Sequence, residues 1–149
     1  MSTFEVVVRE TDSSEETEEF GVEFSKEIRI GDNIILKGEL GSGKTTFVKG
    51  VVKGLGITVN ITSPSFTIIN LYKSESRTTN HEIVVAHIDL YRIEKKDLSG
   101  LGIDEFFLKD YITLIEYGDK LDKEIIESYK FRTISFEHLG GDGRRIKLE

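Results

Sequence analysis

The chain has 149 residues, of which 38% are hydrophobic and 32% are charged, and this composition is typical of one soluble globular domain with its own core. Its formal net charge of −7 disfavours broad, sequence-independent binding to nucleic acid or to an anionic membrane. The chain contains no cysteine, which excludes a disulfide framework and a thiolate metal site and is compatible with a cytoplasmic location. We expect residues 1–149 to form a single domain.

The N-terminal part of the chain predicts a strand, a helix and a second strand. It lacks the pattern of a signal peptide, and no apolar run approaches the roughly 18 residues that a membrane helix requires. Residues 4–10 are rich in β-branched side chains and predict a strand. Ser13 and Glu16 have the spacing of a capping box, which begins a helix. Apolar residues then recur at every fourth position, at Phe20, Phe24 and Ile28. A buried strand is expected over Ile34–Leu36.

The glycine-rich stretch Gly38–Thr46, GELGSGKTT, fits the phosphate-binding pattern G-x-x-x-x-G-K-[ST]. A strand precedes it and a helix is expected over Lys44–Leu55, so backbone N–H groups and the positive end of the helix would face the phosphates of ATP or ADP. We expect Lys44 to reach the β- and γ-phosphates and Thr45 to offer its hydroxyl to Mg²⁺. The expected nucleotide-binding residues are Gly41, Ser42, Gly43, Lys44, Thr45 and Thr46.

The rest of the chain predicts strands that alternate with short helices. Gly50 and Gly54 lower helix propensity within the helix after the loop, which suggests close packing against a neighbour. Strand-like segments cover residues 66–72, 82–91, 111–117, 131–138 and 144–149, with turns expected at 73–80 and 139–143. Short helical pieces are expected over 97–110 and a helix over 119–130. This order predicts an α/β fold, a three-layer P-loop NTPase-like domain whose core sheet is largely parallel, with antiparallel additions and flanking helices.

Two of the predicted strands end in an acid. The stretch IVVAHID delivers Asp89, and YITLIE delivers Glu116. Ligands of open α/β sheets bind beyond the carboxyl ends of the strands, so both carboxylates could face the phosphates. We expect them to form the catalytic set with Lys44, Glu116 sharing the Mg²⁺ with Thr45 and Asp89 acting as the second acid. For either acid alone, an exposed surface carboxylate is the alternative.

The only proline of the chain lies in a hydroxyl-rich loop made of Ser63, Pro64, Ser65 and Phe66. This loop, called the Pro64 loop below, fits either the ordinary start of a strand or a switch-like segment that senses the γ-phosphate.

Residues around Asp89 are secondary candidates for the site. A lone histidine within a strand, His87, is more often packed or hydrogen-bonded than catalytic. Arg92, which follows Tyr91, could equally form an ion pair with an acidic side chain or neutralise phosphate charge.

Other classes of P-loop protein match the chain less well. No guanine-reading N-K-x-D sequence occurs, as a GTPase would need, and a helicase core is normally much larger. A small-molecule kinase usually carries a mobile lid with arginines, whereas the residues after Gly100 contain none until Arg132. The preferred interpretation is an ATPase with a conformational output, and the alternatives are a small-molecule kinase and a nucleotide-gated binding module.

Five motifs in order, GELGSGKTTFVKG, SPSF, HIDLYR, GIDEFF and LIEYGD, resemble those of the TsaE family, formerly called YjeE. The resemblance extends over almost the whole chain, and SPxF together with HxDxYR is far more specific than the phosphate-binding loop. It implies a compact ATPase of bacterial tRNA threonylcarbamoyladenosine synthesis that works with two protein partners, TsaD and TsaB. In that family TsaD modifies N6 of adenosine 37 in tRNAs reading codons that begin with A, and ATP hydrolysis supports repeated turnover of the complex.

The resemblance also implies which residues function and where this chain departs from the family. The functional residues of the family match Lys44, Thr45, Asp89 and Glu116. Ser65 stands where the family usually has threonine, and it keeps the hydroxyl. Tyr117 stands where the family usually has tryptophan, and it keeps a flat aromatic surface without the indole N–H. The protein is expected to meet tRNA through the complex. A small basic cluster near the C-terminus fits a solvated strand face better than a surface for direct tRNA contact: Arg144, Arg145 and Lys147.

Overall fold

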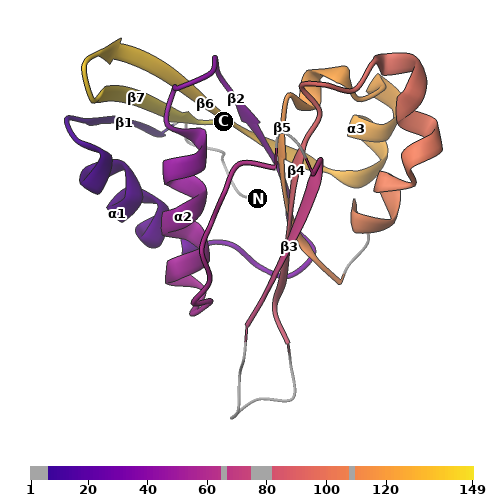
Figure 1. Ribbon diagram of the computed structural model, residues 1–149, viewed down its shortest axis with the longest axis horizontal. Helices are drawn as coiled ribbons and strands as arrows, with labels where there is room; N and C mark the ends of the chain where they lie inside the picture. Colours follow the sequence, from indigo (N-terminus) through magenta and orange to yellow (C-terminus); the bar gives the residue numbers. More distant parts are fainter. Residues whose placement is uncertain (1–6, 65–66, 75–81, 108–109) are drawn as a thin grey trace.

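A seven-stranded mixed sheet forms the centre of the computed structural model, which describes residues 7–64, 67–74, 82–107 and 110–149 (Figure 1). The strands are β1 (Val7–Thr11), β2 (Asn33–Lys37), β3 (Ile69–Lys73), β4 (Val84–Asp89), β5 (Ile112–Glu116), β6 (Phe131–Gly140) and β7 (Gly143–Leu148). Their order is β1-β7-β6-β2-β5-β4-β3. The four strands β6, β2, β5 and β4 are parallel, whereas β7, β1 and β3 are antiparallel additions, as predicted.

Helices cover both faces of this sheet. They are α1 (Ser14–Ser25), α2 (Lys44–Gly54), α3 (Lys123–Tyr129) and the 3₁₀ helices η1 (Lys95–Leu101), η2 (Ile103–Phe107) and η3 (Gly118–Lys120). Figure 1 shows α1 and α2 on one side of the sheet and α3, η1 and η2 on the other. A separate apolar cluster lies on each side, one around Phe47 and the other around Ile88 and Phe106. The predicted three-layer α/β fold is therefore confirmed.

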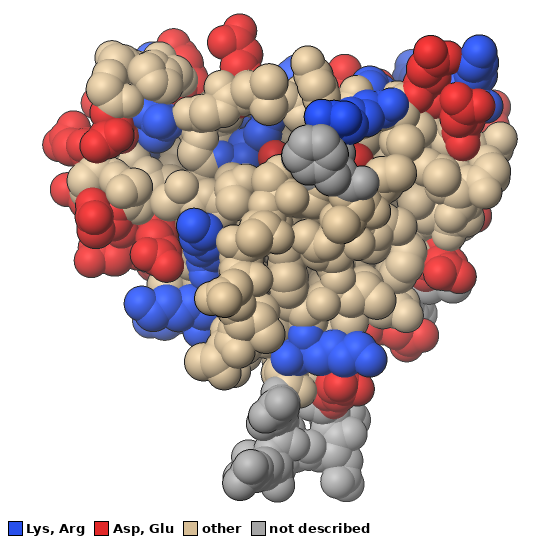
Figure 2. Space-filling view, viewed as in Figure 1, with Lys and Arg blue, Asp and Glu red and all other residues tan. Residues whose placement is uncertain are grey.

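The start of α1 agrees with the predicted cap. The hydroxyl of Ser13 accepts a hydrogen bond from the N–H of Glu16 at 3.1 Å. The carboxylate of Glu16 accepts from the N–H of Asp12 at 2.6 Å, so it binds the residue before the cap instead of the cap itself. Figure 2 shows acidic side chains gathered over α1, where they are solvated.

Several boundaries differ from those expected. β3 begins at Ile69 because Ile68 has a φ of 71°, outside the extended region. The predicted helix over 119–130 is divided into η3 and α3 because Leu121 is extended, with φ −67° and ψ 145°. The antiparallel pairing of β3 and β4 confirms their predicted hairpin. Parts of the predicted segments lie outside the described residues, namely 4–6, 65–66, 75–81 and 108–109.

Glycines set how closely α1 and α2 pack, and this contact fixes the helix that follows the phosphate-binding loop. A Cβ added at Gly50 would overlap the carbonyl oxygen of Glu18, and one added at Gly54 would overlap the hydroxyl of Ser25. Gly21 on α1 makes the reciprocal close approach to α2. The close packing predicted for Gly50 and Gly54 is confirmed, and it outweighs the cost of glycine in a helix.

Replacing Gly50 by alanine should lower the free energy of unfolding by about 1–3 kcal/mol, because the new methyl group meets a backbone oxygen that cannot rotate away. Urea denaturation measures this change. Gly100→Ala is the matched control, since no atom lies within 4 Å of a Cβ at Gly100, and it should stay within about 0.5 kcal/mol of the parent. Equal stability of the Gly50→Ala variant and the parent would contradict the close contact.

Candidate active site

The loop between β2 and α2 has the backbone conformation of an anion-binding loop. Gly41 and Gly43 have φ angles of 77° and 101°, in the left-handed region that favours glycine. Gly43 is the N-cap of α2 and makes no side-chain cap, so the first N–H groups of the helix have no side-chain acceptor there. Backbone donors and the positive end of α2 meet where the sequence predicts the phosphates.

A pocket of about 300 Å³ opens at this loop. Its lining residues are Leu40, Gly41, Gly43, Lys44, Thr45, Thr46, Ser63, Asp89, Glu116 and Arg144. The fold thus brings the loop, both predicted acids and the first residue of the Pro64 loop to one place. Ser42 is buried and lines an adjacent pocket of about 630 Å³ along β6 instead.

Lys44 is buried at the start of α2, with 4% of its surface exposed. Its ammonium donates a hydrogen bond to the carbonyl oxygen of Gly38 and lies 3.9 Å from Oε1 of Glu116. The pKa of Lys44 lies below its usual value because burial disfavours the charged ammonium. The nearby carboxylates, Glu116 foremost, offset part of this effect. The ammonium is therefore held in the pocket by the loop on one side and by a carboxylate on the other.

Glu116 ends β5 and is held by two partners. Its Oε2 lies 2.8 Å from Nε2 of His87, a residue of β4 with no exposed surface. Lys44 contacts the other oxygen. Nδ1 of His87 has no hydrogen-bond partner among the described residues, so the bond to Glu116 fixes the ring. His87 therefore orients this carboxylate within the pocket.

Asp89 ends β4 in register with Glu116 on the neighbouring parallel strand. Its Oδ1 accepts a hydrogen bond from the N–H of Tyr91 at 2.9 Å. Burial raises the pKa of Asp89 and the charge of Glu116 adds to this, although the Tyr91 bond, His87 and Lys44 act in the opposite direction. The two acids predicted from the strand ends therefore lie side by side.

The Pro64 loop is tied to the backbone of Asp89. The carbonyl oxygen of Pro64 accepts from the N–H of Ile68 at 2.7 Å, and the carbonyl oxygen of Ile68 accepts from the N–H of Asp89 at 2.8 Å. Ser63 lines the pocket, whereas Ser65 and Phe66 lie outside the described residues. A movement of this loop would thus act on the strand end that carries an acid.

Comparison with known proteins identifies the family of this chain. A family model described as "Threonylcarbamoyl adenosine biosynthesis protein TsaE" matches residues 11–146. The chain belongs to the TsaE family.

Individual relatives of this TsaE family member match over most of its length. TsaE of Bacillus subtilis strain 168 is 36% identical over 116 residues, which cover 78% of this chain and 68% of the relative. TsaE of Treponema pallidum is 33% identical over 137 residues, covering 91% of this chain and 95% of the relative. A crystal structure of YdiB from Bacillus subtilis superposes with a TM-score of 0.73 at 30% identity, covering 99% of this chain and 87% of YdiB.

Tyr117, which follows Glu116 at the end of β5, lies directly under Lys44. The Lys44 ammonium is 4.2 Å from the centre of its ring, and the ring packs on that of Tyr91 at 4.9 Å. Burial, with Asp89 and Glu116 nearby, raises the pKa of the Tyr117 hydroxyl. The Tyr117 ring therefore packs against the Lys44 ammonium without lining the pocket itself.

Lys120 holds the turn that follows Asp89, and sequence reasoning missed it. Its ammonium donates to the carbonyl oxygens of Leu90, Tyr91 and Ile93 at 2.7, 2.7 and 2.9 Å. These contacts fix the turn that supplies the Tyr91 N–H to Asp89. Nothing in the spacing of one lysine among many indicates such a role. Arg92 is exposed and does not line the pocket.

The three residues of the basic cluster near the C-terminus, Arg144, Arg145 and Lys147, have different neighbours in the structure. Arg144 lines the pocket, which no sequence pattern indicated. Arg145 points elsewhere and pairs with Glu10 at 2.9 Å and with Glu137 at 3.2 Å. Lys147 lies 3.5 Å from Glu149. The three residues therefore do not act as one basic surface.

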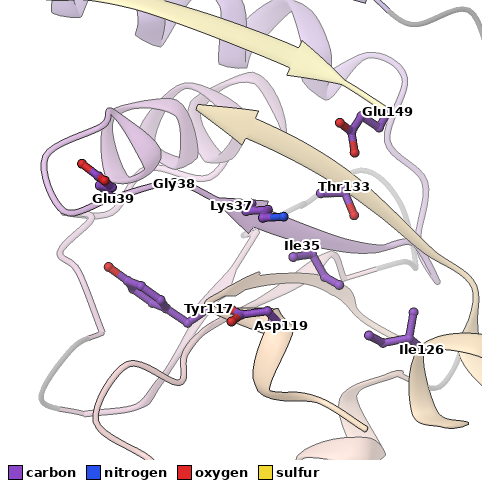
Figure 3. Close-up of a pocket in the computed structure, with 10 residues that line it drawn as sticks. Ile35, Lys37, Gly38, Glu39, Tyr117, Asp119, Ile126, Thr133 and Glu149 are labelled. Atoms are coloured by element: carbon purple, nitrogen blue, oxygen red, sulfur yellow. The ribbon is translucent and has the colours of Figure 1, made fainter. Parts of the chain in front are cut away.

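A larger pocket, of about 530 Å³, lies next to Gly38 and Tyr117 (Figure 3). Figure 3 shows Tyr117 and Asp119 on one side of it and Thr133 and Glu149 on the other. This pocket is lined by neither Lys44, Thr45 nor the two acids. The residues predicted to bind phosphate and metal therefore meet in the smaller pocket, which all four line.

The donor groups at the pocket suit Mg²⁺ shared with phosphates. Thr45 contributes a hydroxyl, and Asp89 and Glu116 contribute carboxylates, the hard oxygen ligands that Mg²⁺ combines with phosphate oxygens. Among the described residues, no group of three or more histidine and acidic side chains could hold a metal ion by itself. A search of the same residues finds no helix that is long and apolar enough to span a membrane.

Asp89→Asn should stabilise the folded protein at pH 7 by about 1 kcal/mol. Because burial raises the pKa of Asp89, the folded state disfavours the charged carboxylate relative to the unfolded state. This cost in folding free energy vanishes at low pH, where Asp89 is protonated in both the folded and the unfolded state, and it grows as the pH rises through the acid range. Asparagine keeps an oxygen for the Tyr91 N–H. Urea unfolding of both proteins at about pH 3 and at pH 7 measures the difference, and a gain that is the same at both pH values would contradict this account.

Proposed function

We propose that the protein is an ATPase of tRNA threonylcarbamoyladenosine synthesis. It would bind Mg²⁺ and ATP in the cytoplasm, hydrolyse the γ-phosphate and so drive turnover of a TsaD–TsaB complex that modifies N6 of adenosine 37 in tRNAs reading codons that begin with A. The observation that carries the proposal is the meeting of Lys44, Thr45, Asp89 and Glu116 in one pocket at a phosphate-binding loop. The tRNA pathway is supported by family membership and by the names of the relatives.

The metal would be held by Thr45 and Glu116. Glu116 ends the strand directly beside β2, from which the loop emerges, whereas Asp89 lies one strand further away. Lys44 contacts Oε1 of Glu116 in the structure. When the ammonium pairs with phosphate, this oxygen loses its partner and becomes available to the ion. The bound ion supplies neutralisation of the charge that develops on the phosphates.

The remaining residues of the pocket would position the attacking water and stabilise the charge on the phosphates. Hydrolysis of ATP requires placement of water and stabilisation of charge more than covalent chemistry. Lys44 and the loop N–H groups stabilise the phosphate charge, and Asp89 orients the attacking water. His87 keeps Glu116 in place through the bond to Oε2.

The link between the Pro64 loop and Asp89 would transmit the state of the nucleotide to protein partners. Ser63 lines the pocket, and Ile68, two residues after the loop, accepts a hydrogen bond from the backbone N–H of Asp89. Loss of the γ-phosphate would therefore change the surroundings of Ser63, and the hydrogen bonds of Ile68 connect Pro64 to the backbone of Asp89. This supports an output that is conformational and directed to TsaD and TsaB.

Lys44→Ala and Glu116→Ala should each lower ATP turnover at least about 100-fold, because each removes a group that faces the developing phosphate charge or its metal. The measurement is phosphate release in the presence of TsaB and TsaD, with circular dichroism to verify folding. Lys49→Ala is the matched control, since this lysine of α2 is exposed and should leave turnover unchanged. Normal hydrolysis by the Glu116→Ala variant would refute the assignment of that acid.

Co-purification with TsaD and TsaB, with and without ATP, followed by a tRNA-modification assay, tests the pathway. We expect modification to continue over several turnovers only with the intact protein and ATP. Phosphate transfer from labelled ATP to any acceptor other than water would identify a kinase instead. Nucleotide-dependent association without hydrolysis under any condition would identify a nucleotide-gated binding module.

A further inference from the structure

Arg144 enters the pocket from an element that is distant in sequence from the phosphate-binding loop. It lies on β7, 103 residues after Gly41, yet lines the same pocket as Lys44. The register pairs Arg144 with Thr11 on β1 and with His138 on β6. Because β7 is held by a strand on each side, the backbone that presents Arg144 is fixed.

The guanidinium of Arg144 lies against the loop through neutral groups. Nη2 donates to the carbonyl oxygen of Gly41 at 2.9 Å, and Nη1 donates to those of Gly141 and Gly143 at 3.0 and 2.8 Å. Nε is buried and has no hydrogen-bond partner among the described residues. A Cβ built on Gly43 would lie 3.4 Å from that nitrogen, which places the unpaired donor at the N-cap of α2.

The charge of Arg144 has no anionic partner among the described contacts, whereas that of its neighbour does. Every hydrogen bond recorded for Arg144 goes to a carbonyl oxygen, which is neutral. Arg145 is matched by two carboxylates, those of Glu10 and Glu137. A buried N–H donor and an unbalanced cation at a phosphate-binding loop suit an oxygen of a phosphate, which arginine binds with charge-assisted hydrogen bonds.

We infer that Arg144 is a further phosphate-binding residue of this pocket and holds the phosphate chain of the nucleotide together with Lys44 and the loop N–H groups. The inference rests on the proposed binding of ATP and ADP at the same site. Two cations from separate elements, α2 and β7, then face one polyphosphate. Arg144 also anchors the Gly41 carbonyl, so the loop and the charge are positioned by the same side chain.

Arg144→Gln separates the charge from the anchoring of the loop, because glutamine retains an N–H donor for Gly41 but carries no charge. The affinity for ADP, measured by isothermal titration calorimetry, should fall about 10- to 100-fold. Arg145→Gln, on the other face of the same strand, is the matched control and should stay within about 2-fold. The difference in ADP affinity between the parent and Arg144→Gln should narrow as the salt concentration increases, since added ions screen the attraction between Arg144 and the phosphates in the parent.

The outcomes separate this inference from the proposed function. A folded parent protein that binds neither ADP nor ATP would overturn both. A parent that binds ADP, with equal binding by Arg144→Gln, would overturn only the role of Arg144. A loss of affinity that is independent of salt would show that Arg144 merely anchors the loop, and would overturn the phosphate contact.

Chemical modification of the parent protein provides a test that needs no variant. Saturating ADP should protect Arg144 from phenylglyoxal, as mapped by mass spectrometry of peptides, while Arg145 reacts at an unchanged rate. Equal modification of Arg144 with and without ADP would overturn the inference even if the Arg144→Gln variant did not fold.

Discussion

The buried contact between Lys44 and Glu116 is the interaction on which the site depends. The two residues have 4% and 3% of their surface exposed, and His87 behind them has none. Charges withdrawn from water to this extent are tolerated only when each has a partner, and removal of one leaves the other unpaired. Lys44, Glu116 and His87 therefore hold one another in place at the edge of the pocket. This arrangement also explains why a histidine is buried within β4.

Parallel pairing of the central strands makes this contact possible. Because β2, β5 and β4 run in the same direction, their carboxyl ends meet at one edge, and the register places Leu36, Glu116 and Asp89 in one row. The other side of the pocket depends on α2, which is held at a fixed distance from α1 by glycine contacts on both helices. The position of the loop thus depends on the packing of α1 along α2.

The sequence predicts the parts of the site that follow from local patterns and from the geometry of parallel sheets. The glycine loop is a contiguous motif, and Asp89 and Glu116 are recognisable because each ends an apolar strand. Arg144 and Lys120 could not be found in this way. Arg144 is tied to the loop by the carbonyl oxygen of Gly41, 103 residues away, and the partners of Lys120 are carbonyl oxygens 27–30 residues away. A backbone carbonyl leaves no signature in the sequence. The sequence also could not predict the break in the strand at Ile68, because a β-branched residue favours extended backbone and is among the least expected at a positive φ.

The position of Tyr117 beneath the Lys44 ammonium has a spectroscopic consequence. The chain contains no tryptophan, so its ultraviolet emission comes from tyrosine alone. An indole introduced at position 117 would be the only one in the protein, at a site where the ring centre now lies 4.2 Å from the Lys44 ammonium. Its fluorescence would report directly on the charge and solvent around Lys44. Position 117 is thus a suitable place for an optical probe of the surroundings of Lys44.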